Sequence, residues 1–95
     1  MRVTIHRDGG MLGRRVGGRV DTTSLPPGRR DPLESALSDP GRLRRAAGVT
    51  PPAGAADVPT YEVTIPSGHF VISALCGDAD LVAALEAAVR ETGTR

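Results

Sequence analysis

Strict alternation of apolar and polar residues in two short segments constrains the fold most strongly. Tyr61, Val63 and Ile65 alternate with polar residues, and Val3 and Ile5 do the same near the N-terminus. A period of two is typical of a strand that buries one face and exposes the other to water. These segments therefore predict a sheet that is covered on one side.

A glycine-rich turn follows the first of these strands and predicts a hairpin. Residues 8–13 contain three glycines, which tolerate the positive φ values of tight turns. We predict the second strand over residues 14–20. Gly17 and Gly18 lie in its middle and indicate a bulge or a sharp twist.

A second hairpin is predicted around the Pro-Ser-Gly turn at residues 66–68. Its second strand alternates less cleanly, because Val71 and Leu75 make the outer face apolar as well. We therefore expect either that this face is covered or that the strand is central in the sheet.

Two amphipathic helices are predicted, one after each hairpin. The first has Asp31 as its N-cap and proline in the first helical position. Residues 39–41 end or kink this helix, and the residues after them could add one more turn. The second runs through Arg90 and is capped by Asp78 or Asp80. Its apolar residues fall on one stripe.

This order of elements, ββαββα, predicts one α+β domain over residues 1–95, with a four-stranded, mostly antiparallel sheet and two helices on one face. The length suits a single small domain. Residues 48–59 are rich in Pro, Ala and Gly without periodicity, and we interpret them as a mobile loop. The path of this loop decides whether the hairpins meet in parallel or antiparallel, and the sequence leaves that open.

Charge and composition exclude several classes of protein. Twelve arginines, no lysine and 11 acidic residues give a net charge of +1, too small for a dedicated nucleic-acid binder. No apolar run approaches the ~20 residues that a membrane helix needs. Without the apolar segment of a signal peptide near the N-terminus, we expect a cytoplasmic protein. The arginine, alanine and glycine bias suggests a bacterial source.

No group of residues predicts catalysis, a metal centre or a bound cofactor. His6 and His69 occupy strand positions that are expected to face solvent. Cys76 has no His or Cys near it in the sequence, so we interpret it as a small buried apolar residue. Nucleophile-elbow and phosphate-loop motifs are also missing. We therefore expect that the protein is not an enzyme.

The most unusual local feature is a pair of large apolar residues, Met11 and Leu12, between glycines in the first hairpin loop. Such side chains either fold back over the hairpin or offer an apolar anchor to a pocket of a partner. The loop is the leading candidate for binding, and residues 48–59 are the second. The candidate binding residues are Gly9, Gly10, Met11, Leu12, Gly13 and Arg14.

In several of these segments the chain resembles the emfourin family of proteinaceous inhibitors of thermolysin-like (M4) zinc metalloproteases. The segments that carry the resemblance, in the same order as in the family, are residues 9–13, 21–27 and 54–57, then the strand 61–65 and the Leu-rich terminal helix. The resemblance implies a competitive inhibitor without catalytic residues or cofactor, whose loops occlude the active-site cleft. Met11 or Leu12 would then suit an apolar pocket of the protease.

Two features depart from the family's pattern. Met11 stands where members typically carry an aromatic residue, and the first helix, bracketed by Pro32 and Pro40, is shorter than usual. Both bear on which protease is bound. The alternative function is a small interaction module that binds an acidic partner or nucleic acid through arginines gathered on one face. Steep salt dependence of binding would distinguish this module from an apolar protease contact.

Overall fold

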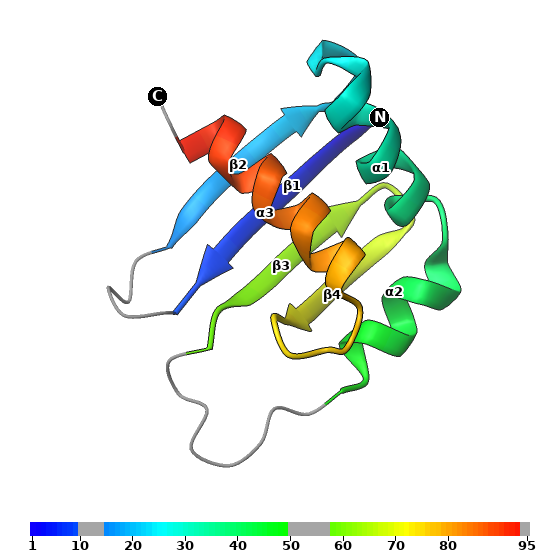
Figure 1. Cartoon of the computed structure of the whole chain (residues 1–95), viewed down its shortest axis with the longest axis vertical. Coiled ribbons are helices and arrows are strands. Elements are labelled where there is room, and N and C mark those ends of the chain that lie inside the picture. The colour runs from blue at the N-terminus through cyan, green and yellow to red at the C-terminus, as the bar shows by residue number, and fades with distance from the viewer. Residues whose placement is uncertain (10–14, 50–57, 94–95) are drawn as a thin grey trace.

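This computed structural model describes residues 1–9, 15–49 and 58–93. They form a sheet with helices packed on one face (Figure 1). The strands are β1 (Arg2–Asp8), β2 (Val16–Asp21), β3 (Thr60–Ile65) and β4 (Gly68–Ser73). The α-helices are α1 (Pro27–Leu37), α2 (Pro40–Ala47) and α3 (Ala79–Gly93), and a 3-10 turn (Thr22–Ser24) follows β2.

The strands are ordered β2-β1-β3-β4, and every neighbouring pair is antiparallel. The two hairpins therefore meet through β1 and β3, with Ile5 opposite Val63. This pairing answers the question that the sequence left open, and it confirms the predicted α+β class with its antiparallel sheet.

The core lies between the sheet and the helices, as the alternating segments predict. Val3, Ile5 and Val63 are at most 2% exposed, and they face the helical layer. Helix α3 crosses that face of the sheet (Figure 1). Its buried stripe belongs to the same core cluster as the buried strand residues. The stripe consists of Leu81, Leu85, Ala88 and Val89, with Val82 partly buried beside it.

The N-cap predicted for the first helix is wrong. Helix α1 begins at Pro27 rather than after Asp31, and Pro26 precedes it without a side-chain cap. The backbone amides of Arg29 and Arg30 donate to the Pro26 carbonyl, which starts the helix one turn earlier. Pro32 is therefore inside the helix, where its missing N–H affects only the exposed first turn.

Asp39 begins a further helix instead of only ending the first. Its carboxylate accepts from the backbone amide of Arg42 at 3.0 Å, and Pro40 occupies the first position of α2. The described chain thus has one more α-helix than the two predicted. Residues 50–57 of the predicted loop 48–59 lie outside the described part.

Both expectations for the outer face of β4 are wrong. Among the described strands, β4 pairs only with β3 and forms an edge of the sheet, and Val71 and Leu75 are 50% and 49% exposed. In β2, the pairing with β1 runs without a bulge. Gly17 follows this path with a φ of 118°, a region that L side chains rarely adopt.

Candidate functional site

The structure describes one of the six candidate binding residues, Gly9. The others, Gly10, Met11, Leu12, Gly13 and Arg14, lie outside the described residues, as do 50–57 of the second candidate loop. The structure does show where the chain leaves and re-enters the fold on either side of these segments.

The residues on both sides of the first segment, and those that follow the second, lie at one end of the sheet, which we call the loop end: Asp8, Gly9, Arg15, Val58 and Pro59. Asp8 pairs with Thr60, so the end of β1 lies beside the start of β3 (Figure 1). Gly9 has a φ of 87°, and a Cβ there would lie 3.4 Å from the Val58 carbonyl oxygen. The first candidate loop and the C-terminal end of the second therefore share a common base.

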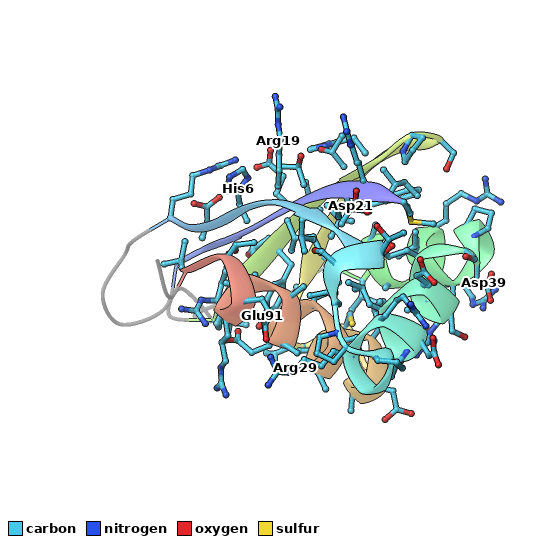
Figure 2. The ribbon with its side chains drawn as sticks, turned by 90° about the horizontal axis from the view of Figure 1, so that it is seen from above. His6, Arg19, Asp21, Arg29, Asp39 and Glu91 are labelled. Atoms are coloured by element: carbon cyan, nitrogen blue, oxygen red, sulfur yellow. The ribbon has the colours of Figure 1, made fainter. Side chains whose placement is uncertain are left out.

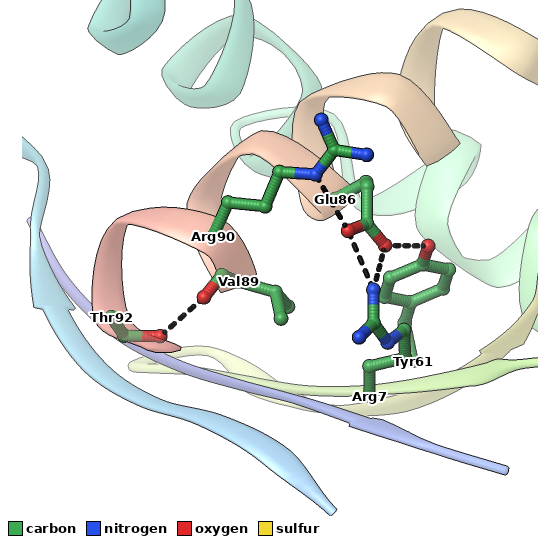
Figure 3. Close-up of polar contacts among 6 residues, drawn as sticks. All are labelled: Arg7, Tyr61, Glu86, Val89, Arg90 and Thr92. Atoms are coloured by element: carbon green, nitrogen blue, oxygen red, sulfur yellow. Dashed lines mark hydrogen bonds and ion pairs between the residues drawn. The ribbon is translucent and has the colours of Figure 1, made fainter. Parts of the chain in front are cut away.

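A side-chain cluster fastens this base to α3 on the helical face of the sheet. Glu86 accepts two hydrogen bonds from Arg7 Nη1, at 2.7 Å to Oε1 and 2.6 Å to Oε2. The Tyr61 hydroxyl donates to Glu86 Oε1 at 2.6 Å, and Arg90 Nε donates to Oε2 at 3.1 Å (Figure 3). Arg7 and Tyr61 are directly opposite each other on β1 and β3.

The ionisation of this cluster is set by its contacts. Burial raises the pKa of Glu86, but hydrogen bonds from Tyr61 and Arg7 outweigh it and hold that pKa below its ordinary value. Burial, followed by the hydrogen bond to Glu86, raises the pKa of Tyr61 well above its usual 10.0. At neutral pH a carboxylate therefore accepts from a guanidinium and a neutral phenol.

A polar network covers the same end on the helix-free face of the sheet. Arg15 donates to Asp8 at 2.9 Å, lies 3.3 Å from Glu62 Oε2, and contacts His6 Nδ1 at 3.2 Å. The hydrogen bond to Arg15 lowers the pKa of Glu62. His6 lies on the sheet face away from the helices, as predicted (Figure 2), and His69 is exposed there next to Glu62.

Within the described residues, no group of His, Cys, Asp and Glu side chains could hold a metal ion. Cys76 is 9% exposed and belongs to the core, which agrees with its interpretation as a small apolar residue. Among the same residues, no helix is long and apolar enough to cross a membrane.

The arginines are mostly engaged in ion pairs. The paired arginines and their partners are Arg7 and Arg90 with Glu86, Arg15 with Asp8, Arg29 with Glu91, Arg30 with Asp31 and Arg42 with Asp78. The side chains of Arg2, Arg19, Arg44 and Arg45 make no ion pair or hydrogen bond to any residue in the described ranges. The first two lie on β1 and β2 and the last two on α2, beside the opposite edge of the sheet, so they do not form one basic face.

Sequence reasoning missed Glu86. Its position opposite the apolar stripe of α3 predicts a solvated side chain, yet its side chain is only 20% exposed and contacts β1 and β3. The available signal was Tyr61, because a tyrosine on the buried face of a strand needs a partner for its hydroxyl.

Comparison with known protein families gives one match over nearly the whole length. The model of the family described as Emfourin matches residues 5–93, from the first strand to the last described helix. No curated protein and no solved structure matches the chain significantly.

Proposed function

The chain belongs to the Emfourin family, a family of metalloprotease inhibitors, and from this premise we propose that it is a competitive protein inhibitor of a thermolysin-like (M4) zinc metalloprotease. The match over residues 5–93 is the observation that carries the proposal.

The proposed mechanism is occlusion of the active-site cleft by the first hairpin loop, with residues 48–59 as the second candidate for the contact. Met11 or Leu12 enters an apolar pocket of the protease, and the glycines next to them let the backbone approach closely. The common base supports this arrangement, because the first loop and the C-terminal end of the second lie at the same end of the sheet, where one cleft can reach both.

The sheet contributes to affinity by limiting the freedom of the loops before binding. A loop whose two ends are fixed by β1 and β2 loses less entropy on binding than a free peptide. The same restraint slows cleavage, because it holds the peptide carbonyl of the loop away from the geometry that the zinc-bound water would need. A substrate-like segment thus remains bound as an inhibitor.

The test is inhibition of purified thermolysin-like proteases acting on a peptide substrate. We expect activity to fall in proportion to added protein until the two are near equimolar, and the apparent inhibition constant to rise with substrate concentration. A serine protease assayed in parallel is the control and should stay active. Unchanged turnover by several thermolysin-like proteases would contradict the proposal. Complexes that dissociate steeply with added salt would favour the arginine module instead.

A further inference from the structure

We propose that Glu86 is a positioning residue for the loop end: its carboxylate holds the ends of β1 and β3 in the arrangement that the protease binds. This inference rests on the proposed function, and it assigns a role in recognition to a residue of α3 that lies outside the candidate loops. Glu86 touches no residue of the proposed contact segments that the structure describes.

The partners of Glu86 lie next to both candidate loops in the chain. Arg7 precedes Gly9 by two residues, and Tyr61 follows Pro59 by two residues. Each therefore lies on a strand that connects directly to one of the candidate loops. Because Arg7 and Tyr61 are cross-strand neighbours, one carboxylate reaches both.

The contacts of Glu86 are strong and directional. A carboxylate that accepts from a guanidinium forms charge-assisted hydrogen bonds, and the two contacts of Arg7 engage both of its oxygens. The Tyr61 hydroxyl completes the set on the same side (Figure 3). The cluster is partly buried, with Arg7 31% and Glu86 20% exposed, so solvent screens it less than a surface pair.

Loss of the Glu86 carboxylate would release the strand ends from α3. Arg7 and the Tyr61 hydroxyl would then lack their shared acceptor in a partly buried place, and each would turn toward water or toward another partner. The ends of β1 and β3 would no longer be fixed relative to the helix. The apolar core would remain, because among its described residues Tyr61 alone is hydrogen-bonded to the Glu86 side chain.

The experiment compares Glu86→Gln with a matched variant at the other end of the sheet, Thr22→Val. Thr22 is fully buried, and its hydroxyl donates to Glu34 Oε2 at 2.5 Å and lies 3.2 Å from the Met1 carbonyl oxygen. Thr22→Val removes the buried hydroxyl, and Glu86→Gln removes the charge and one of the two acceptor oxygens, each with little change of volume. Thermal midpoints, inhibition constants and dissociation rates are measured for both at a temperature where each is folded.

We expect Glu86→Gln to raise the inhibition constant about tenfold, through faster dissociation of the complex. Thr22→Val should lower the thermal midpoint by a similar amount but change the inhibition constant by less than about twofold. Tyr61→Phe is the second variant, and it should shift the constant in the same direction by a smaller factor. Equal effects of Glu86→Gln and Thr22→Val, or an unchanged constant in Glu86→Gln, would overturn the proposal.

A measurement without protease separates this inference from the proposed function. Amide hydrogen exchange of the free protein should become faster at Asp8, Gly9 and Thr60 in Glu86→Gln but not in Thr22→Val. Unchanged exchange at these amides would refute positioning by Glu86 even if the wild-type protein inhibits. Faster exchange in Glu86→Gln, together with a wild-type protein that inhibits no protease, would reject the proposed function alone.

Discussion

Gly17 of β2 lies against the carbonyl oxygen of Ile5 on β1, with a φ of 118° and no space for a Cβ. Any L side chain there would be strained in its backbone and would overlap that oxygen. We expect Gly17→Ala to lower the free energy of unfolding by about 2 kcal/mol or more, as measured by denaturant unfolding.

The neighbouring glycine provides the control for this prediction. A Cβ at Gly18 meets no atom within 4 Å, and its φ is not in the positive range. Gly18→Ala should therefore be neutral within about 0.5 kcal/mol. If the two substitutions lower the free energy of unfolding equally, the contact of Gly17 with Ile5 is not the cause of the loss.

The first hairpin loop is tested by placing a charge at its apolar residues. We expect Met11→Asp and Leu12→Asp each to raise the inhibition constant for a thermolysin-like protease by at least about tenfold, or about 1.4 kcal/mol, because an aspartate cannot enter an apolar pocket unpaired. Inhibition titrations at fixed substrate concentration measure the change.

Val71→Asp is the matched control for the loop variants. Val71 is an exposed apolar residue on the edge strand β4 and is not among the candidate binding residues. The substitution should leave inhibition unchanged. If both loop variants inhibit like the wild type, the first hairpin loop does not contact the protease.

Asp78 links α2 to the start of α3 and predicts a specific loss of stability in acid. Arg42 donates to both of its oxygens, at 2.6 and 2.7 Å, and Leu81 donates its backbone amide. These contacts, the bond from Arg42 above all, lower the pKa of Asp78 from 3.8 to about 2. Because the folded-state pKa is depressed, the stabilisation is present above pH 3.8 and is lost as the pH falls toward about 2.

Asp78→Asn isolates this charge, because asparagine is also a good N-cap. At neutral pH the variant should be less stable by about 1 kcal/mol, after screening by solvent, and the difference should vanish at the acid end of that range. Asp80→Asn, also in the first turn of α3, is the control and should have little effect. A difference between Asp78→Asn and wild type that does not depend on pH would contradict this assignment.

Tyr61 is the only tyrosine of the chain, so tyrosinate absorbance reports on this residue alone. Its pKa is raised in the folded state, by burial first and then by the bond to Glu86. We therefore expect full stability below pH 10.0, the ordinary tyrosine value, and a progressive loss above it, since the unfolded chain ionises first. Ionisation should coincide with unfolding by circular dichroism. Ionisation near pH 10.0 in a folded protein would contradict the buried hydrogen bond.

The sequence predicts those elements whose local pattern and tertiary role agree. Val3, Ile5 and Val63 alternate with polar neighbours because one face of the sheet meets helices, and all three are buried. Asp78 is one of the two caps predicted for the last helix, and it accepts from the Leu81 amide. In such places the nearest residues are sufficient to decide the structure.

Other features depend on contacts between distant segments. The first turn of α1 is polar and exposed, so it lacks the apolar period that would reveal a helix before Asp31. The antiparallel pairing of β1 with β3 depends on how the chain returns to the sheet after α2. The position of Glu86 in the sequence predicts a solvated side chain. It accepts hydrogen bonds in the folded protein because Arg7 and Tyr61, on two different strands, lie next to it. The structure describes none of residues 10–14, so the candidate loop itself stays a prediction.

The common base at the loop end has a consequence for evolution and engineering. The chain departs from and rejoins the sheet there at Gly9, Arg15 and Val58, while the core residues occupy the strands and helices. Loop length and sequence can therefore diverge without repacking the interior, as in antibody domains that keep one framework for many antigens. Grafting loops between relatives is then a direct route to new protease specificities on an unchanged scaffold.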